Sequence, residues 1–129
     1  MRPTKAHVDL DALRHNLGVA ADLAPGSRNV AVIKANAYGH GMVEAAFALR
    51  DTADALAVAT MDEALELREA GINGPLLVLQ GVTSKGDVEE AAARDLWLML
   101  HDRGQLEKVL AAPGDKAITA WLKVDSGMH

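Results

Sequence analysis

The sequence has no cysteine, few aromatic residues and no excess of basic residues, and each shortage excludes a class of protein. Without cysteine, a disulfide framework and a thiolate metal site are both impossible. Lysine and arginine number 13 against 18 aspartate and glutamate residues, and no basic run is interleaved with aromatics, so we expect no nucleic-acid partner. His7, His15 and His101 are scattered without a carboxylate at ligand spacing, so we expect no metal.

Long apolar runs are also missing. The N-terminal segment MRPTKAHVDLD lacks the apolar core of a secretion signal, and no run is long enough to span a bilayer. We therefore expect no membrane partner and a cytoplasmic location. Half of the 129 residues are nevertheless apolar, so a single domain, or a piece of a larger one, has enough material for a buried core.

The order of apolar segments predicts an α/β fold. Residues 9–24 form an amphipathic helix that Asp9 caps and Pro25 follows. Five apolar runs come next, each beginning about 20 to 25 residues after the start of the last, and most of the intervals between them have helical patterns. The runs begin near Val30, Ala55, Leu76, Leu96 and Ile118, and the fifth is predicted to be a strand over residues 118–124. Such alternation of strand and helix is typical of a parallel sheet.

Polar residues at capping spacing mark the predicted helix starts. Three pairs have this spacing, each just after an apolar run: Thr60 with Glu63, Ser84 with Asp87, and Asp102 with Gln105. Gly71 and the pair Pro113 and Gly114 mark helix ends. The carboxylates along these helices, Glu63 among them, are interpreted as solvated faces.

The stretch from Asn29 to Gly41 contains the main candidate for chemistry. An apolar strand over residues 30–33 ends at Lys34, and Asn36, Gly39 and Gly41 then indicate a tight turn before a helix. Lys34 therefore lies where barrels and open α/β enzymes assemble their sites. One interpretation is that it extends from the strand end to solvent or pairs with a nearby carboxylate. The other is an amine, held neutral by its surroundings, that attacks a carbonyl carbon. Position alone favours the first interpretation.

The string VIKANAYGHG, residues 32–41, resembles the pyridoxal-phosphate attachment signature of the alanine racemases. The similarity runs along the chain from VDLDALRHNL to LKVDSGMH. The resemblance implies a (β/α)8 TIM barrel followed by a β-rich C-terminal domain. Residues 1–129 would then be the N-terminal portion, an N-terminal helix and about five βα units, with the rest of the barrel and the C-terminal domain absent. Spacing alone also allows an open doubly wound sheet. An open piece of barrel would expose two sheet edges.

The resemblance also implies the chemistry. Lys34 would hold pyridoxal 5'-phosphate as an internal aldimine and then act as one of two acid/base groups that interconvert L-alanine and D-alanine. The group on the opposite face is, in the family, a tyrosine from the partner subunit of a homodimer, and it is not in this chain. The family's role is to supply D-alanine for bacterial peptidoglycan.

Three further residues near Lys34 receive predictions. Tyr38 is either a half-buried ring at the strand end or, as the resemblance implies, a phosphate ligand through its hydroxyl. His40 and Asn36 are interpreted as residues that hold the loop rather than as catalysts.

A second cluster, KVDSGMH, ends the sequence at residues 123–129. Pattern alone indicates an ordinary strand terminus with a Ser-Gly turn. The resemblance implies that Lys123 carries a carbamate that orients an arginine placed just beyond His129. Carbamylation needs a neutral amine, so this prediction requires a buried Lys123.

Other functions stay open at this level. One is a serine or broad-specificity racemase of the same fold, another is a pyridoxal-phosphate-binding protein without turnover, and a third is a non-catalytic remnant. The 129-residue chain alone is expected to racemise poorly or not at all, because part of the expected site lies outside it.

Overall fold

A computed structural model describes residues 3–112 and 116–127, and its centre is a five-stranded parallel sheet. The strands follow one another in chain order: β1 (Val30–Val32), β2 (Ala55–Val58), β3 (Leu76–Val78), β4 (Trp97–Leu100) and β5 (Ala120–Leu122). The helices are α1 (Leu10–Leu23), α2 (Lys34–Gly39), α3 (Met42–Leu49), α4 (Met61–Glu69), α5 (Lys85–Ala93) and α6 (Arg103–Leu110). The predicted α/β fold is confirmed.

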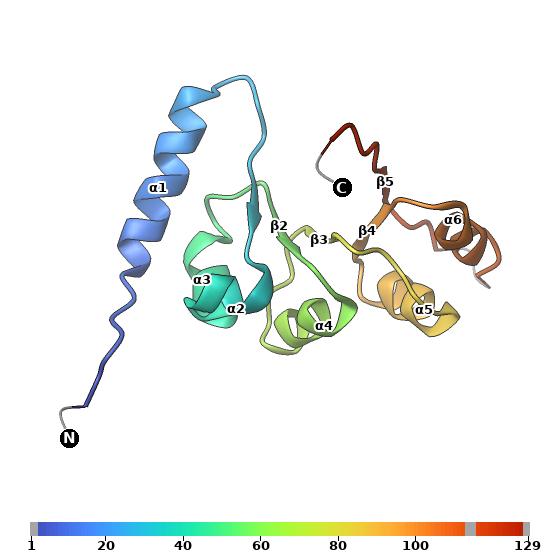
Figure 1. Ribbon diagram of the computed structural model, residues 1–129, viewed down its shortest axis with the longest axis horizontal. Coiled ribbons are helices and arrows are strands. Elements are labelled where there is room, and N and C mark those ends of the chain that lie inside the picture. Colours follow the sequence, from blue (N-terminus) through green and yellow to red (C-terminus); the bar gives the residue numbers. More distant parts are fainter. Residues whose placement is uncertain (1–2, 113–115, 128–129) are drawn as a thin grey trace.

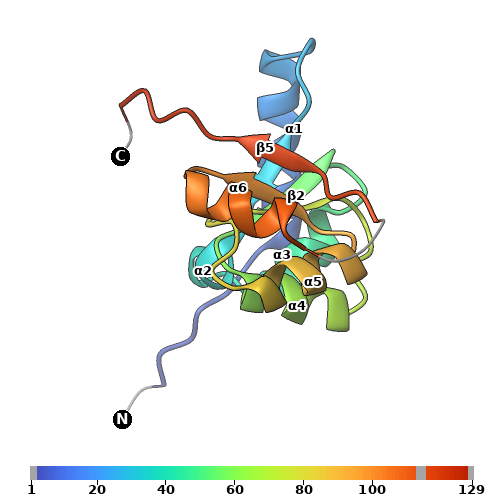
Figure 2. The ribbon, with the colours of Figure 1, turned by 90° about the vertical axis from the view of Figure 1, so that its right-hand side faces the viewer.

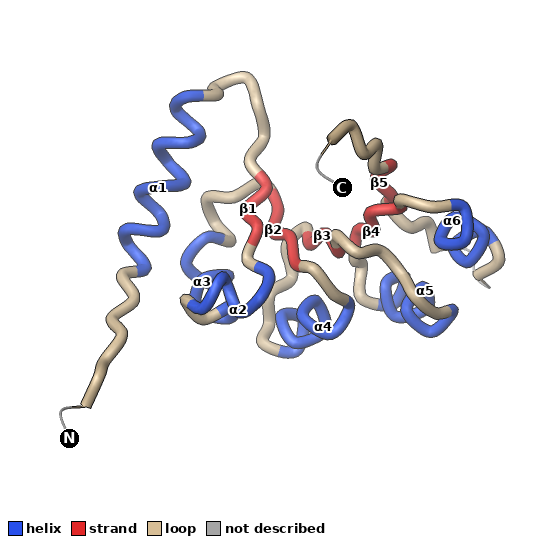
Figure 3. The backbone as a smooth tube through the Cα atoms, viewed as in Figure 1, coloured by secondary structure: helices blue, strands red, loops and turns tan. Residues whose placement is uncertain are grey.

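The sheet is curved, with α2 to α6 along its convex side and the other side left open (Figures 1 and 3). All residues of β2 and β3 are buried. β1 and β5 form the two edges, and Val32 and Leu122 on them are exposed. The expected pair of open edges is therefore present.

The core lies between the sheet and the outer helices. Its largest fully buried side chains come from α4, β3, β4 and the segments that precede two of these strands: Leu67, Ile72, Leu76, Leu96 and Leu98. α1 contributes no buried residue and lies beside α3, where the Arg14 Nε donates to the Ala48 carbonyl oxygen at 2.9 Å. Among the described residues, no helix has both the length and the apolar character needed to cross a membrane.

The helix starts lie where the capping pairs predict them. Asp9 caps α1, and reciprocal capping boxes begin α4 and α5 at Thr60 and Ser84. At α6 the carboxylate of Asp102 accepts from the Gln105 backbone N–H at 2.8 Å, but the Gln105 side chain bonds elsewhere. The predicted helix end at Pro113 and Gly114 lies outside the described residues.

The last strand is shorter than the sequence indicates. A strand was expected over residues 118–124, whereas β5 covers only Ala120–Leu122 and every residue in it is exposed. It pairs on one side alone, with β4, so nothing in the described chain extends the ladder. The segment after β5 runs away from the other elements (Figure 2).

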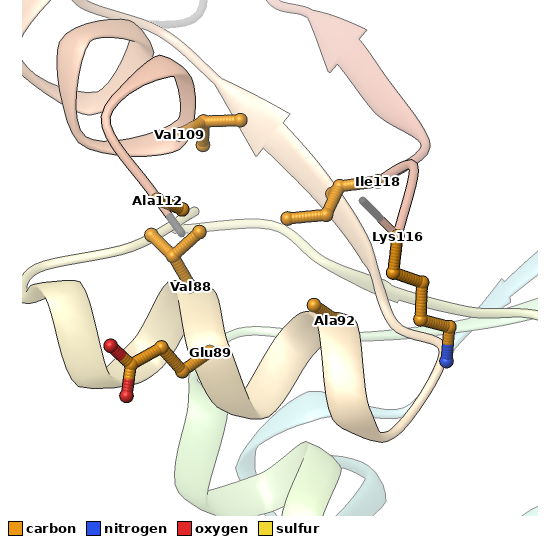
Figure 4. A pocket seen from close by; sticks show the side chains of 7 residues that line it. All are labelled: Val88, Glu89, Ala92, Val109, Ala112, Lys116 and Ile118. Atoms are coloured by element: carbon orange, nitrogen blue, oxygen red, sulfur yellow. The ribbon is translucent and has the colours of Figure 1, made fainter. Parts of the chain in front are cut away.

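A hollow of about 130 Å³ lies between α5, α6 and the segment before β5. Figure 4 shows apolar side chains from these elements around it, with Glu89 and Lys116 at its ends. It lies at the β5 end of the sheet, remote from the strand that Lys34 follows.

Arg68 joins two loops at the amino-terminal edge of the sheet. Its guanidinium donates to the carbonyl oxygens of Ile72 at 2.6 Å and Gly74 at 3.0 Å, both before β3. It also donates to the carbonyl oxygens of Arg94 and Asp95, both at 3.0 Å, before β4. Burial lowers the pKa of Arg68 and the nearby Asp95 charge partly offsets this. One side chain thus fixes the entry into two strands.

We expect Arg68→Lys to lower the free energy of unfolding by about 1 to 2 kcal/mol, because an ammonium cannot match the planar fork that serves four carbonyls. The measurement is chemical denaturation of the full-length protein. The matched control is Arg103→Lys at the exposed start of α6, which we expect to change stability by less than about 0.5 kcal/mol. Equal losses for the two variants would contradict the expectation.

Candidate active site

Lys34 directly follows the first strand at the carboxyl edge of the sheet. The Ile33 backbone N–H donates to the Ala57 carbonyl oxygen at 2.8 Å, so pairing with β2 continues to the residue before the lysine. The Lys34 side chain is partly buried. The predicted location of the lysine, between a strand and the following helix, agrees with the structure.

The four residues after Lys34 form a left-handed turn. Ala35, Asn36, Ala37 and Tyr38 have φ values of 52°, 55°, 51° and 54°, with ψ values between 36° and 52°. L-residues occupy this region at a cost of roughly 1 to 2 kcal/mol each, and they usually do so singly rather than in runs. The turn brings Lys34 and Tyr38 onto one short segment, α2, at one edge of the sheet.

Local hydrogen bonds hold the far end of this turn. The side-chain oxygen of Asn36 accepts from the Met42 N–H at 2.8 Å, and a ring nitrogen of His40 lies 2.8 Å from the Ala37 carbonyl oxygen. Gly39 and Gly41 have φ values of +88° and +93°, a conformation that favours glycine. The loop-holding roles predicted for Asn36 and His40 are confirmed.

Tyr38 is 61% exposed, so the half-buried ring is the wrong interpretation of its position. The ring borders an apolar hollow of about 300 Å³ between α1 and the segment from β1 to α3. Residues lining the hollow are Leu13, Val32, Ile33, Ala37, Tyr38, His40, Ala45 and Leu49. Lys34 is not among these lining residues.

Glu63 links the Lys34 loop to the next loop of the sheet. One carboxylate oxygen accepts from the Ala35 N–H at 2.7 Å, and the other accepts from the N–H groups of Ala59 at 2.7 Å and Thr60 at 3.2 Å. The interpretation of Glu63 as part of a solvated helix face is therefore wrong. Its capping spacing was visible in the sequence, but the contact to Ala35 spans 28 residues and has no local signal.

Gln105 joins the next two loops in a similar way. Its side-chain amide donates to the Gln80 carbonyl oxygen at 2.8 Å, and its oxygen accepts from the His101 N–H at 3.2 Å. Gln105 is only 6% exposed and lies against Gly81, which has a φ of +70°. The loops after β3 and β4 are thereby fixed relative to each other.

Asp87 stays within its own loop. Its carboxylate accepts from the N–H and hydroxyl groups of both Thr83 and Ser84, at 2.7 to 2.9 Å. Burial raises the pKa of Asp87, but these four hydrogen bonds outweigh burial and hold the pKa below its ordinary value. It is the same position in the capping box as Glu63, occupied by a shorter side chain.

The second predicted cluster lies after β5, at the opposite edge of the sheet from β1. Lys123 is exposed, and its backbone N–H donates to the Leu100 carbonyl oxygen at 2.9 Å. The burial that a carbamate requires is therefore not present at this lysine, and its role stays a prediction. The Gly127 N–H donates to Asp125 at 3.2 Å, as in a turn, while Met128 and His129 lie outside the described residues. Within residues 3–112 and 116–127, no three His, Asp or Glu side chains gather to hold a metal.

Comparison with known families agrees with this geometry. The sequence model described as "Alanine racemase, N-terminal domain" matches residues 8–129. The chain belongs to the alanine racemase family.

Curated alanine racemases match the whole chain. The alanine racemase of Pseudomonas entomophila is 49% identical over 129 residues, which is 100% of this chain and 36% of that protein. A relative from Pseudomonas putida, named "Alanine racemase, catabolic", is 50% identical over the same shares. The chain thus spans about a third of the length of the curated relatives that it matches.

Solved alanine racemases share the fold. The biosynthetic alanine racemase of Pseudomonas aeruginosa superposes with a TM-score of 0.93 at 44% identity, covering 100% of this chain and 36% of the other. The enzyme from E. faecalis gives a TM-score of 0.87 at 38% identity, covering 98% and 35%. The five strands and their helices therefore correspond to the N-terminal part of the alanine racemase TIM barrel, so the barrel is the correct alternative to the open doubly wound sheet.

Proposed function

We propose that the protein containing this chain is an amino-acid racemase that interconverts L-alanine and D-alanine, with pyridoxal phosphate bound to Lys34. The observation that carries the proposal is the position of Lys34, which begins α2 and is separated from β1 only by Ile33, at the carboxyl edge of a sheet in the alanine racemase family. In barrels of this kind the residues at that edge act on the substrate.

The residues at this edge fit a phosphorylated aldehyde. Lys34 offers a primary amine that is partly buried, and Tyr38 offers an exposed hydroxyl on the same segment. The left-handed turn holds both residues at fixed places along α2. In this proposal Lys34 binds the aldehyde carbon and Tyr38 donates a hydrogen bond to the phosphate.

When bound, pyridoxal phosphate would supply an electron sink for the charge left when the substrate loses its Cα proton. Lys34 would accept or return that proton at Nζ, on one face of the substrate. A second acid/base group on the other face is needed for inversion. In the family this group is a tyrosine of the partner subunit, and we propose the same homodimeric arrangement here.

The test is racemisation by the full-length protein. With pyridoxal phosphate and L-alanine in deuterium oxide, we expect D-alanine to form and deuterium to enter Cα. L-Serine run in parallel distinguishes an alanine enzyme from a serine or broad-specificity racemase. Cofactor binding without deuterium uptake would contradict the proposal in favour of a carrier protein.

The 129-residue chain on its own is proposed to be inactive, because the opposite-face tyrosine of the family is not among its residues. Circular dichroism of the purified 129-residue chain would first establish that it is folded. Turnover by a folded preparation would contradict the proposal.

The biological use of the product is a separate proposal. The Pseudomonas aeruginosa structure is named biosynthetic, whereas the Pseudomonas putida relative is named catabolic. We propose the biosynthetic use, supply of D-alanine for peptidoglycan. The full-length gene should then restore growth of a D-alanine auxotroph when expressed from its own promoter, and failure to do so would favour the catabolic use.

A further inference from the structure

Glu63 forms two more contacts than a helix cap needs. A capping box requires only that the third helical residue accept from the backbone N–H of the capping residue. Glu63 does this for Thr60 and takes the Ala59 N–H with the same oxygen. Its other oxygen accepts at 2.7 Å from Ala35, which belongs to the preceding βα loop.

Asp87 provides an internal comparison. It occupies the equivalent position in the capping box of α5, and all four of its hydrogen bonds go to Thr83 and Ser84 in its own loop. The helix start at α5 is thus complete without a contact to a neighbouring loop. The extra methylene of Glu63 serves the link to Ala35, not the cap.

The Ala35 amide is a sensitive point for Lys34. The peptide bond that carries this N–H joins Lys34 to Ala35, so a hydrogen bond to it fixes the plane that follows the lysine Cα. Ala35 is also the first residue of the left-handed turn. Because non-glycine residues in that conformation persist only when their surroundings hold them, the turn needs an anchor at its start. Asn36 and His40 hold its far end, and the Ala37 N–H donates to the Ile33 carbonyl oxygen at 2.9 Å within the turn itself. The contact of Ala35 with Glu63 ties the start of the turn to a neighbouring loop.

We propose that Glu63 is the positioning residue for Lys34: its carboxylate clamps the Lys34–Ala35 peptide to the start of α4 and so sets where the lysine amine lies. The expected effect of Glu63 on turnover rests on the proposed function. The expected effect of Glu63 on the conformation of residues 34–41 is independent of that function.

The experiment uses the full-length protein with Glu63→Asp, a change that models the Asp87 arrangement: the cap is kept and the reach to Ala35 is lost. We expect kcat for L-alanine to fall about tenfold to a hundredfold, because a small misplacement of a reacting group has effects of that size. The KM should stay within about threefold, since alanine recognition is not altered. In protein without added cofactor, amide hydrogen exchange at residues 34–41 should accelerate by about tenfold or more.

Asp87→Asn is the matched control. It weakens the cap of α5 and should lower the melting temperature, yet leave both kcat and exchange at residues 34–41 at wild-type values. The proposal is overturned if Glu63→Asp leaves either readout unchanged, or if Asp87→Asn changes both as much. If the wild-type protein does not racemise alanine, the proposed function fails, and the exchange measurement alone then decides the role of Glu63.

Discussion

Lys34→Ala is expected to lower the rate of alanine racemisation by at least about a thousandfold, because in the proposed function this one side chain supplies both the cofactor attachment and an acid/base group. Lys34→Arg should be equally inactive although it keeps the positive charge, since a guanidinium does not form an imine. The melting temperature of both variants should stay close to that of the wild type, because Lys34 is only partly buried and ends a strand at the edge of the sheet.

The matched control for Lys34→Ala is Lys85→Ala, on the exposed first turn of α5, which should retain activity within about twofold. A second measurement identifies the attachment directly: borohydride reduction with pyridoxal phosphate, followed by peptide mass mapping, should label Lys34. Modification at another lysine, or activity of Lys34→Ala within tenfold of the wild type, would contradict the assignment.

Gly81→Ala is expected to give the largest loss of stability, about 3 kcal/mol in the free energy of unfolding. Gly81 has a φ of +70°, which strains any L-residue. An added Cβ would overlap the backbone carbonyl oxygen of Met99 and lie 2.6 Å from the side-chain oxygen of Gln105. The carbonyl belongs to β4, and Gln105 is already held by Gln80 and His101, so neither neighbour can move freely.

Gly18→Ala is the control for this change. Gly18 lies within α1, and an added Cβ there meets no atom within 4 Å. Alanine should therefore stabilise the helix by about 0.5 to 1 kcal/mol. Thermal and chemical unfolding of the full-length variants checks both expectations, and a melting temperature of Gly81→Ala equal to that of the wild type would show that the loop adjusts at little cost.

Features set by local residues could be predicted from the sequence. Asp9, Thr60 and Ser84 cap helices where the sequence predicts, because a cap involves only residues within one turn of each other. The strand starts at Val30, Ala55 and Leu76 also coincide with the apolar runs. The position of Lys34 just after a strand was also predicted from the apolar run before it. β5 was overestimated in length because apolar pattern does not reveal that a strand has one neighbour only.

Features set by distant residues could not be predicted. The contact of Glu63 with Ala35 depends on two loops meeting in space, and a glutamate on a helix is most often solvated. The left-handed turn could not be predicted because it contains Ala35 and Ala37. Alanine is unfavourable in the left-handed conformation, so these residues would predict a different backbone. The role of Arg68 could not be predicted either, because its four partners are backbone carbonyl groups, which every residue has.

The residues that stabilise the fold around Arg68 lie at the opposite edge of the sheet from the residues for which we propose a function. Its four hydrogen bonds lie where β3 and β4 begin, whereas Lys34 and the contact of Glu63 with Ala35 lie where β1 and β2 end. Substitutions that raise heat tolerance can therefore be sought among the loops before β3 and β4 without disturbing the edge at which we propose catalysis. A directed-evolution library restricted to those loops should yield variants with higher melting temperatures whose turnover numbers stay near the parental value.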